Sequence, residues 1–236
     1  MPLALLTGAS RGFGKAVASA LVAQGWDLVV DARDTAALDR TVAGLRGRAA
    51  PGVQVLAVPG DVADPAHREV LARVVRTLGR VDLLVNNASA LGTSPLPMLE
   101  HYRLEVLAQV LAVNVLAPLG LIQALLADLT DADGTVINLS SDAAVEAYPG
   151  WGGYGASKAA LDQLTAVLAI ERPDLRIFGF DPGDMRTEMH QDAFAGEDIS
   201  DRPEPETVVP ALLRLVTERP PSGRYRAADL LAGAKR

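Results

Sequence analysis

Short apolar runs bounded by turn residues alternate along the chain with longer segments in which apolar residues recur every three to four positions. Most of the short runs, such as LALL and VINL, are apolar on both faces, which is typical of central parallel strands covered by helices. Repeated strand–helix–strand units with right-handed crossovers then wind the chain onto both sides of one sheet. We therefore expect an α/β fold, a doubly wound and mainly parallel sheet of seven strands with helices on both faces. The expected strands lie at residues 3–7, 27–32, 53–58, 82–86, 135–139, 175–180 and 223–227.

The helix that follows the third strand has clear start and stop signals. Asp64 is a good N-cap, Pro65 fits the first helical position, and Gly79 ends the segment. Three apolar residues between these signals share one face of the predicted helix: Val70, Val74 and Leu78.

Two segments depart from the alternation. Residues 187–206 are polar, rich in Asp, Glu and Pro, and without a clear period, so we expect a mobile lid or loop there. Residues 106–126 are the most apolar stretch, but Gln, Asn, Pro and Gly interrupt them, which favours a buried or interface helix over a membrane span. No internal repeat or low-complexity tract is visible, and we expect a single domain over residues 1–236.

Charge and aromatic content narrow the classes of function. Among 236 residues, 29 are acidic and 22 are basic, and the net charge of −7 repels phosphate backbones and anionic lipid. Two Trp, four Tyr and four Phe are too few to build base-stacking platforms. These counts argue against nucleic-acid and membrane partners.

The absence of cysteine removes disulfides, thiolate metal sites and cysteine nucleophiles, and it is compatible with a reducing cytosol. The three isolated histidines argue against a zinc site. The first residues have no basic region and only a four-residue apolar run, so we expect no secretory signal and a mature chain that begins here. Together these features predict a soluble, cytoplasmic protein without a metal.

A glycine-rich segment, TGASRGFG at residues 7–14, joins the first expected strand to a helix. Such a turn presents unpaired backbone N–H groups to a pyrophosphate, and the glycines at 8, 12 and 14 let that ligand come close. An ordinary glycine-rich turn is the alternative. The position of the segment within a β-α-β frame favours dinucleotide binding.

Further motifs stand at the ends of later strands and in the helices that follow them. The tripeptide NNA at 86–88 follows the fourth strand, Asn114 lies in the next helix, SS at 140–141 follows the fifth strand, and Tyr154 precedes Lys158 by four residues. With the glycine spacing, these motifs resemble those of the short-chain dehydrogenase/reductase family of soluble single-domain proteins, over residues 3 to about 228. The resemblance implies a Rossmann fold and a catalytic set of Asn114, Ser141, Tyr154 and Lys158.

The Tyr–Lys pair also has a physical rationale. Residues four apart on a helix project from the same face, so the ammonium of Lys158 can approach the phenol of Tyr154. A phenol with its usual pKa of about 10 is a poor acid–base catalyst, and nearby positive charge lowers that pKa by stabilising the phenolate. An exposed tyrosine and lysine on a solvated helix is the alternative for an isolated pair.

Two polar residues complete the candidate catalytic set. Ser141 ends a parallel strand at the carboxyl edge of the sheet, where its hydroxyl can donate to a substrate carbonyl. A turn-capping serine is the alternative, and the spacing to Tyr154 favours Ser141 over Ser140. Asn114 is costly in so apolar a helix unless its side chain is satisfied. The resemblance makes Asn114 a helix-kinking residue that holds a water linking Lys158 to solvent, and a purely structural asparagine is the alternative.

The end of the second strand bears on the choice of cofactor. In the NAD-preferring relatives an acidic residue at the position of Ala32 binds the adenosine ribose, whereas here that position is apolar and Arg33 follows. Arg33 and Arg11 could clamp a 2′-phosphate by charge-assisted hydrogen bonds, which favours NADP(H) over NAD(H). Asp31 is the counter-evidence, because a shift of one residue would make it the ribose ligand.

Two departures from the family pattern lie near the expected nicotinamide. The segment DPGDMRT at 181–187 is similar to the family's P-G-x-x-x-T segment, but Asp181 before it is unexpected, and Ser89 stands where a glycine usually follows Asn-Asn-Ala. Asp61 and Val62 resemble the adenine-contacting pair, with a turn residue as the alternative for Asp61. The cofactor contacts implied by the resemblance are Gly8, Ser10, Arg11, Gly12, Phe13, Gly14, Arg33, Asp61, Val62, Asn87, Ala88, Tyr154, Lys158, Pro182, Gly183, Met185 and Thr187.

We therefore expect an NADP(H)-dependent oxidoreductase in which Tyr154 exchanges the alcohol proton while hydride passes to or from a carbonyl carbon. A cofactor-binding redox sensor without turnover is the alternative. Tyr148, Trp151, Met189 and Phe194 offer apolar surface without a cation pair, which favours uncharged ketones or aldehydes over keto acids. Helices at residues 104–126 and 161–170 are apolar over more than one face, and we expect a homodimer or homotetramer.

Overall fold

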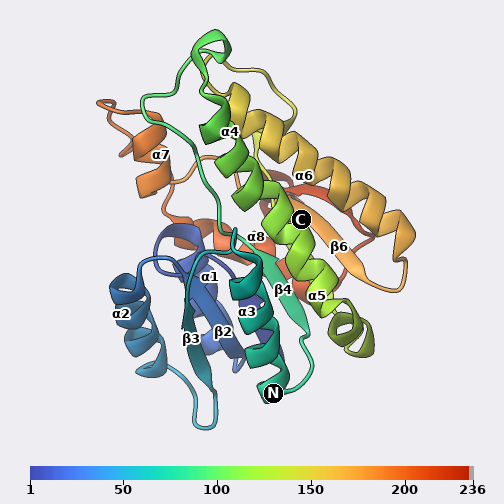
Figure 1. Ribbon diagram of the computed structural model, residues 1–236. Helices are drawn as coiled ribbons and strands as arrows, with labels where there is room; N and C mark the ends of the chain where they lie inside the picture. Colours follow the sequence, from blue (N-terminus) through green and yellow to red (C-terminus); the bar gives the residue numbers. More distant parts are fainter. Residues whose placement is uncertain (234–236) are drawn as a thin grey trace.

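The computed structural model describes residues 1–233 as one seven-stranded sheet with helices on both faces (Figure 1). The strand order is β3-β2-β1-β4-β5-β6-β7, and every pairing is parallel. The expected doubly wound sheet is confirmed, and each strand lies within two residues of its predicted position. The strands are β1 (Leu3–Leu6), β2 (Asp27–Ala32), β3 (Val55–Pro59), β4 (Leu83–Asn86), β5 (Thr135–Leu139), β6 (Arg176–Asp181) and β7 (Gly223–Arg226).

Alternating residues of the strands feed two separate hydrophobic cores. In β1, Ala4 and Leu6 belong to one core, whereas Leu3 and Leu5 belong to the other. The first core is covered by α1 (Gly12–Ala23), α2 (Thr35–Arg46), α8 (Pro205–Glu218) and α9 (Ala227–Gly233). The second is covered by α3 (Pro65–Leu78), α5 (Ala117–Asp131) and the end of α6 (Gly152–Glu171). Apolar runs that are buried on both faces thus explain why the sequence forms central strands.

Helix α3 begins and ends where its sequence signals predict. The Asp64 carboxylate accepts a hydrogen bond from the Ala66 N–H, Pro65 is the first helical residue, and Gly79 is the C-cap. Its buried stripe differs from the predicted face, because Val70, Val74 and Leu78 are only partly buried at the margin of the core. The fully buried residues of α3 are His67, Leu71, Ala72 and Val75.

The most apolar stretch forms one continuous helical segment composed of α4 (Leu104–Leu111), a π-helical turn (Ala112–Leu116) and α5. By length and composition residues Leu104–Asp131 could cross a membrane, but half of their most apolar window is buried. Leu121, Leu125 and Leu129 of α5 lie in the second core, where α5 packs against α3. This segment is therefore a core helix, as its interrupted sequence predicts.

The segment expected to be irregular contains a short helix, α7 (Glu188–Ala193), followed by turns up to α8. The Thr187 hydroxyl caps α7 by accepting a hydrogen bond from the His190 N–H at 3.2 Å. Figure 1 shows α7 beyond the ends of the strands, beside the long loop that follows β4. A hydrogen bond from the Ser94 hydroxyl to the Asp192 carbonyl joins that loop to α7.

Candidate active site

A cavity of about 110 Å³ lies at the carboxyl edge of the sheet, between the ends of β5 and β6, the start of α6, and α7. Doubly wound folds bind their ligands at this edge. The cavity brings together two of the predicted catalytic side chains with apolar and polar side chains from three other segments. Its lining includes Ser141, Trp151, Tyr154, Asp184, Met189 and His190.

Tyr154 lies in the first turns of α6, and its side chain is buried against the cavity wall. Burial raises the pKa of Tyr154 to about 12, while the hydroxyls of Ser89 and Ser141 oppose this shift by favouring the phenolate. The indole of Trp151 contacts the phenol ring edge-on, with the centroids 5.7 Å apart. The tyrosine is therefore held as a protonated phenol at neutral pH.

Lys158 follows one helical turn later and is only 2% exposed. Its ammonium lies 5.5 Å from the centroid of the Tyr154 ring and donates a hydrogen bond of 2.7 Å to the Leu139 carbonyl. Burial lowers the pKa of Lys158 to about 8, and the nearby Asp162 opposes that shift. Burial of the phenol thus outweighs the lowering of the Tyr154 pKa that we expected from the neighbouring lysine.

Ser141 and Ser140 have different partners, although they are adjacent at the end of β5. The Ser141 hydroxyl caps the short 3-10 helix Asp142–Ala144, accepting from the Ala143 N–H at 3.2 Å and donating to Asp142 at 2.9 Å. Ser140 donates to Asp162 at 2.8 Å. Ser141 is therefore both the capping residue that we weighed as an alternative and the serine beside Tyr154.

Asn114 occupies the π-helical turn, where a widened turn is typical of functional sites. Its buried amide bonds both main-chain groups of Ala90, at 2.7 and 2.9 Å, and accepts from the Ser89 hydroxyl at 3.2 Å. Its amide nitrogen also donates to Ser157 of α6 at 2.9 Å, and Ser157 in turn donates to the Tyr154 carbonyl. Asn114 thus joins the loop after β4 to α6 and is fully satisfied in doing so.

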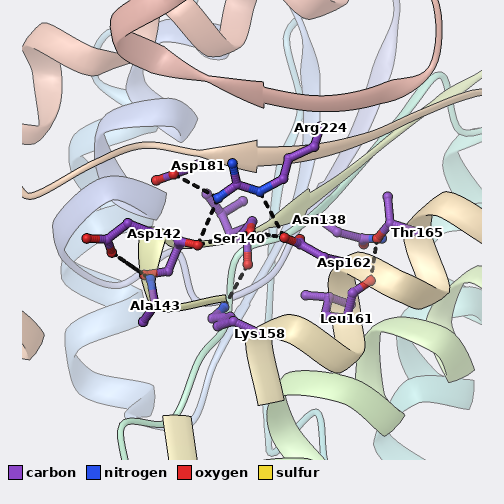
Figure 2. A network of polar contacts seen from close by, with 12 residues as sticks. Asn138, Ser140, Asp142, Ala143, Lys158, Leu161, Asp162, Thr165, Asp181 and Arg224 are labelled. Atoms are coloured by element: carbon purple, nitrogen blue, oxygen red, sulfur yellow. Dashed lines mark hydrogen bonds and ion pairs between the residues drawn. The ribbon is translucent and has the colours of Figure 1, made fainter. Parts of the chain in front are cut away.

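Arg224 of β7 connects three other elements (Figure 2). Its guanidinium donates to Asp162 of α6, to Asp181 of β6, and to the main-chain carbonyl of Ser141, each at 2.9 Å. The second oxygen of Asp181 accepts from the Gly183 N–H at 3.0 Å. The unexpected acid before the Pro-Gly segment therefore has a cationic partner and fixes the start of the loop that follows it.

The glycine loop has the geometry that a dinucleotide phosphate requires. Gly8 and Gly12 have φ angles of +68° and +54°, and a Cβ on Gly14 would lie 2.3 Å from the Gly8 carbonyl oxygen. Arg11, the N-cap of α1, makes no side-chain capping hydrogen bond, so the first N–H groups of α1 have no side-chain cap. Asn87 supports the loop from behind by donating to the carbonyls of Thr7 and Gly8. These residues fit a bound pyrophosphate.

Two other residues of the loop have packing roles. The Phe13 ring is buried and stacks on Phe180, with the centroids 6.0 Å apart, so only the backbone of Phe13 faces the loop's ligand side. The Ser10 carbonyl accepts from Thr41 of α2 at 3.0 Å.

At the adenosine end, Asp31 lies beneath the glycine loop and is 1% exposed. Its carboxylate accepts from the Gly8 N–H at 3.0 Å and lies 3.1 Å from Nε2 of His67. Burial raises the pKa of Asp31, and the His67 and Gly8 hydrogen bonds oppose that shift. The alternative in which Asp31 binds the ribose is therefore not supported, because both of its oxygens already have internal partners.

The remaining adenosine-side residues differ in exposure. Ala32 is buried, whereas Arg33 is exposed and has no ion-pair partner within residues 1–233. Arg11 forms an ion pair with Glu188 of α7, a partner that the sequence did not suggest. Asp61 accepts from the Ala63 N–H at 2.9 Å, as expected for a turn residue, and Val62 beside it is buried.

At the nicotinamide end, the loop from Pro182 to Thr187 borders the cavity. Gly183 has a φ angle of +72°, which favours glycine, and Met185 packs against the first core. The Thr187 methyl lies so close to Gly12 that a Cβ there would approach it to 3.4 Å. The loop after β6 therefore lies close to the glycine loop at Gly12, beside the expected path of the cofactor. Ala88, in the loop after β4, lies close to the glycine loop at Gly8.

Comparison with known proteins identifies the family to which these motifs belong. The sequence profile described as short chain dehydrogenase matches residues 2–198. The chain belongs to the short-chain dehydrogenase family. It is an NAD(P)-dependent oxidoreductase, and its activity class is the interconversion of carbonyl and alcohol groups.

Two curated proteins are similar in sequence to most of this short-chain dehydrogenase. Sepiapterin reductase of Meriones unguiculatus is 36% identical over 198 residues, which cover 79% of this chain and 75% of that protein. Gluconate 5-dehydrogenase of Gluconobacter oxydans (strain 621H) is 30% identical over 235 residues, which cover 98% and 84% of the two chains.

Solved structures resemble the whole fold. An alcohol dehydrogenase from the archaeon Thermococcus sibiricus, complexed with 5-hydroxy-NADP, superposes with a TM-score of 0.85 at 28% identity, covering 96% of this chain and 95% of that one. A protein from Escherichia coli CFT073 complexed with NADPH superposes with a TM-score of 0.87 at 28% identity, covering 96% of each chain.

Three functional positions of this short-chain dehydrogenase escaped sequence reasoning. These positions are Arg224, His67 and Ser157. Each of them bonds a residue of another element that is at least 36 positions away along the chain. The unexpected acid Asp181 was a signal for Arg224, and the asparagine in an apolar helix was a signal for Ser157, since buried polar groups require partners.

Proposed function

We propose that this dehydrogenase reduces an uncharged ketone or aldehyde, and oxidises the corresponding alcohol, with Tyr154 as the acid–base catalyst. The observation that carries the proposal is the placement of the Tyr154 phenol and the Ser141 hydroxyl at one cavity, with buried Lys158 one helical turn below. A phenol, a second donor and a buried cation at the carboxyl edge of a dinucleotide-binding sheet suit proton transfer to a carbonyl oxygen.

The cofactor would lie along the edge of the sheet. The glycine loop and the start of α1 would hold its pyrophosphate, Asp61 and Val62 its adenine, and the segment Pro182–Thr187 with Asn87 and Ala88 its nicotinamide end. When bound, the nicotinamide supplies or accepts a hydride at C4 of its ring.

In the direction of reduction, Tyr154 donates its phenolic proton to the carbonyl oxygen of the substrate. A pKa of about 12 keeps that proton on the phenol at neutral pH, so the acid form is fully available. Ser141 donates to the same oxygen after exchanging its present bond to Asp142 for one to the substrate. Lys158 stabilises the phenolate that remains and contacts the cofactor ribose, and Asn114 keeps a water-linked proton path to Lys158 in order.

NADP(H) is the proposed cofactor. Arg33 is exposed at the end of β2 beside a buried, apolar Ala32, so an anionic 2′-phosphate would meet a guanidinium that has no ion-pair partner within residues 1–233. The similar Thermococcus sibiricus and Escherichia coli proteins are complexed with 5-hydroxy-NADP and NADPH, which supports the same choice here.

The cavity favours neutral substrates. Its charged side chains are carboxylates, including Asp142 and Asp184, whereas Arg186 forms an ion pair with Glu204. Trp151, Met189 and Leu91 supply its apolar surface. An acid-bearing substrate would therefore meet like charge rather than a bidentate cation. Phe194 supports Trp151 from outside the cavity, and Tyr148 bonds Asp142 and Glu146 instead of lining it.

We further propose that the protein is a cytoplasmic homodimer or homotetramer, with residues 187–206 as a lid on its single domain. Leu104, Leu116 and Ile170 are 75%, 58% and 81% exposed on the α4–α5 segment and α6. Such apolar side chains on neighbouring helices are typical of a surface covered by another subunit. The acidic charge makes nucleic acid and anionic membranes poor partners.

The direct test is a panel of neutral ketones, aldehydes and small keto acids assayed by loss of reduced-nicotinamide absorbance, with NADPH and NADH in parallel. We expect turnover with NADPH, fastest for neutral aromatic or alicyclic ketones. Faster turnover of keto acids would contradict the substrate class. Tight binding of NADPH without turnover of any carbonyl would instead support a redox sensor.

A further inference from the structure

Helix α7 contributes a histidine to the cavity wall that neither the fold nor the catalytic set uses. His190 lines the cavity, and its side chain is 10% exposed. Its ring packs on Phe194 with the centroids 4.6 Å apart, and Phe194 packs on Trp151. The imidazole is therefore held in a fixed position by aromatic contacts.

One ring nitrogen of His190 has no partner. Its Nε2 is buried and makes no hydrogen bond to any residue of the described chain, 1–233. Buried polar atoms in proteins are nearly always paired, and an unpaired one on a cavity wall points to a ligand or water contact. No other side chain on the cavity lining has such an unpaired buried atom among the described residues.

The surroundings of the ring decide which hydrogen bond it can make. Burial lowers the pKa of His190, with Asp184 opposing, so the ring is neutral at neutral pH. Its Nδ1 makes no hydrogen bond within residues 1–233 but lies 3.9 Å from an Asp184 oxygen, and this nearby negative charge favours the tautomer with the proton on Nδ1. Arg202 contacts the other oxygen of Asp184 at 3.4 Å. Nε2 then carries a lone pair and can only accept.

Other side chains on the cavity wall also carry hydrogen-bond acceptors. The carboxylates of Asp142 and Asp184 are further acceptors, and the hydroxyls of Ser141 and Tyr154 are committed to the reacting oxygen in the proposed mechanism. A substrate that carried only a carbonyl would leave the Nε2 lone pair of His190 unpaired, and a substrate carboxylate would be repelled by Asp142 and Asp184.

We propose that Nε2 of His190 accepts a hydrogen bond from a hydroxyl or N–H group of the substrate, so that the enzyme prefers neutral carbonyl compounds bearing such a donor. This inference rests on the proposed carbonyl reduction and makes its substrate class narrower. His190 is then a specificity-determining residue, because it contacts a part of the substrate that does not react.

The test compares matched carbonyl pairs, each a hydroxyketone and its deoxy analogue with the same carbon skeleton, in wild type, His190→Leu and His190→Gln. The wild type should prefer the hydroxyketone, and His190→Leu should lose about tenfold of that preference, mostly in KM, as expected for one hydrogen bond. His190→Gln retains an acceptor and should recover part of the preference for the hydroxyketone. His101→Leu, an exposed histidine outside the cavity, is the matched control.

A second readout does not need turnover. The chain has three histidines, so the Nε2 resonance of His190 in ¹⁵N imidazole spectra can be assigned by its loss in His190→Gln. With NADP⁺ present, adding the hydroxyketone should shift that resonance, and adding the deoxy analogue should not. Equal shifts, or a preference that survives His190→Leu, would overturn the inference. Absence of turnover with a selective shift would overturn the proposed reaction and leave the binding role of His190 standing.

Discussion

Tyr154 and Lys158 are perturbed in opposite directions by the same cause. Burial disfavours the charged form of each, so it raises the pKa of Tyr154 to about 12 and lowers that of Lys158 to about 8. At neutral pH only the Lys158 shift costs stability, because the lysine is charged there whereas the tyrosine is neutral in both the folded and the unfolded state. The buried ammonium of Lys158 therefore lowers the stability of the folded protein, as is common for residues kept for function.

Lys158→Met should therefore stabilise the protein while it abolishes activity. The pKa of Lys158 lies below its usual 10.5, so the charged lysine destabilises the folded state most at and below pH 8, and that cost disappears as the pH rises from 8 to 10.5. We expect a gain of about 1–3 kcal/mol at pH 7, reduced by the loss of the Leu139 hydrogen bond, and little gain at pH 10.5.

Urea unfolding of wild type and variant at the two pH values measures the effect. Lys15→Met, at an exposed position of α1, is the control and should change stability little at either pH. A Lys158→Met variant less stable than wild type at neutral pH would show that the lysine's hydrogen bond outweighs its desolvation.

Arg33→Ala should weaken NADPH binding and leave NADH binding nearly unchanged. Loss of a hydrogen bond between a guanidinium and a phosphate costs about 1.5–3 kcal/mol, which is roughly a tenfold to hundredfold loss of affinity. Fluorescence titration with both nucleotides gives the ratio. Arg48→Ala, an exposed arginine beyond the end of α2, should leave that ratio unchanged. An enzyme whose preference for NADPH survives Arg33→Ala would need another phosphate ligand.

Among the elements, one guanidinium from β7 joins the ends of β5 and β6 to the middle of α6. Arg224 neutralises Asp162 and Asp181 and bonds the main chain of Ser141 (Figure 2). Asp181 in turn accepts a hydrogen bond from the Gly183 N–H in the loop after β6. Ser141, the proposed catalytic serine, and the proposed nicotinamide loop thus share a common support.

Arg224→Met should leave the buried carboxylate of Asp181 and the partly buried carboxylate of Asp162 without a cation and destabilise the fold by about 3 kcal/mol. It should also weaken NADPH binding, because the loop at Gly183 loses its anchor. Arg226→Met, on the same strand but exposed, is the control for loss of charge. Thermal unfolding and nucleotide titration report the two effects, and adding Asp181→Asn should recover part of the stability. An Arg224→Met protein as stable as Arg226→Met would show that Arg224 does not support these elements.

The sequence predicts elements better than it predicts partners. All seven strands were expected, and for the central strands the reason is that burial on both faces leaves apolar runs delimited by turn residues, whereas the edge strand β7, with the sequence GRYR, is only partly buried. Helix α7 was not expected, since six residues are too few to show a period. Ser141, Tyr154 and Lys158 follow from a fixed spacing, whereas the bonds of Arg224 to Asp162 and of His67 to Asp31 join residues 62 and 36 positions apart and leave no local pattern.

The whole molecule exposes apolar side chains on one pair of neighbouring helical segments. Leu104 and Leu116 of the α4–α5 segment and Ile170 of α6 are exposed, although α4 and α6 contact each other. Light scattering in solution should give the mass of a dimer or tetramer, and Ile170→Lys should shift that mass toward the monomer of 24.7 kDa. A monomeric wild type would contradict the proposed assembly.

The central claim is that Tyr154 transfers the proton in a carbonyl reduction at this cavity. The most direct measurement compares wild type and Tyr154→Phe for NADPH-dependent turnover of the best carbonyl in the panel, alongside NADPH affinity. The phenylalanine ring preserves the contacts with Trp151 and removes only the hydroxyl. We expect turnover to fall by at least about a hundredfold while NADPH affinity stays within experimental error. Turnover retained within a few fold of wild type would contradict the account.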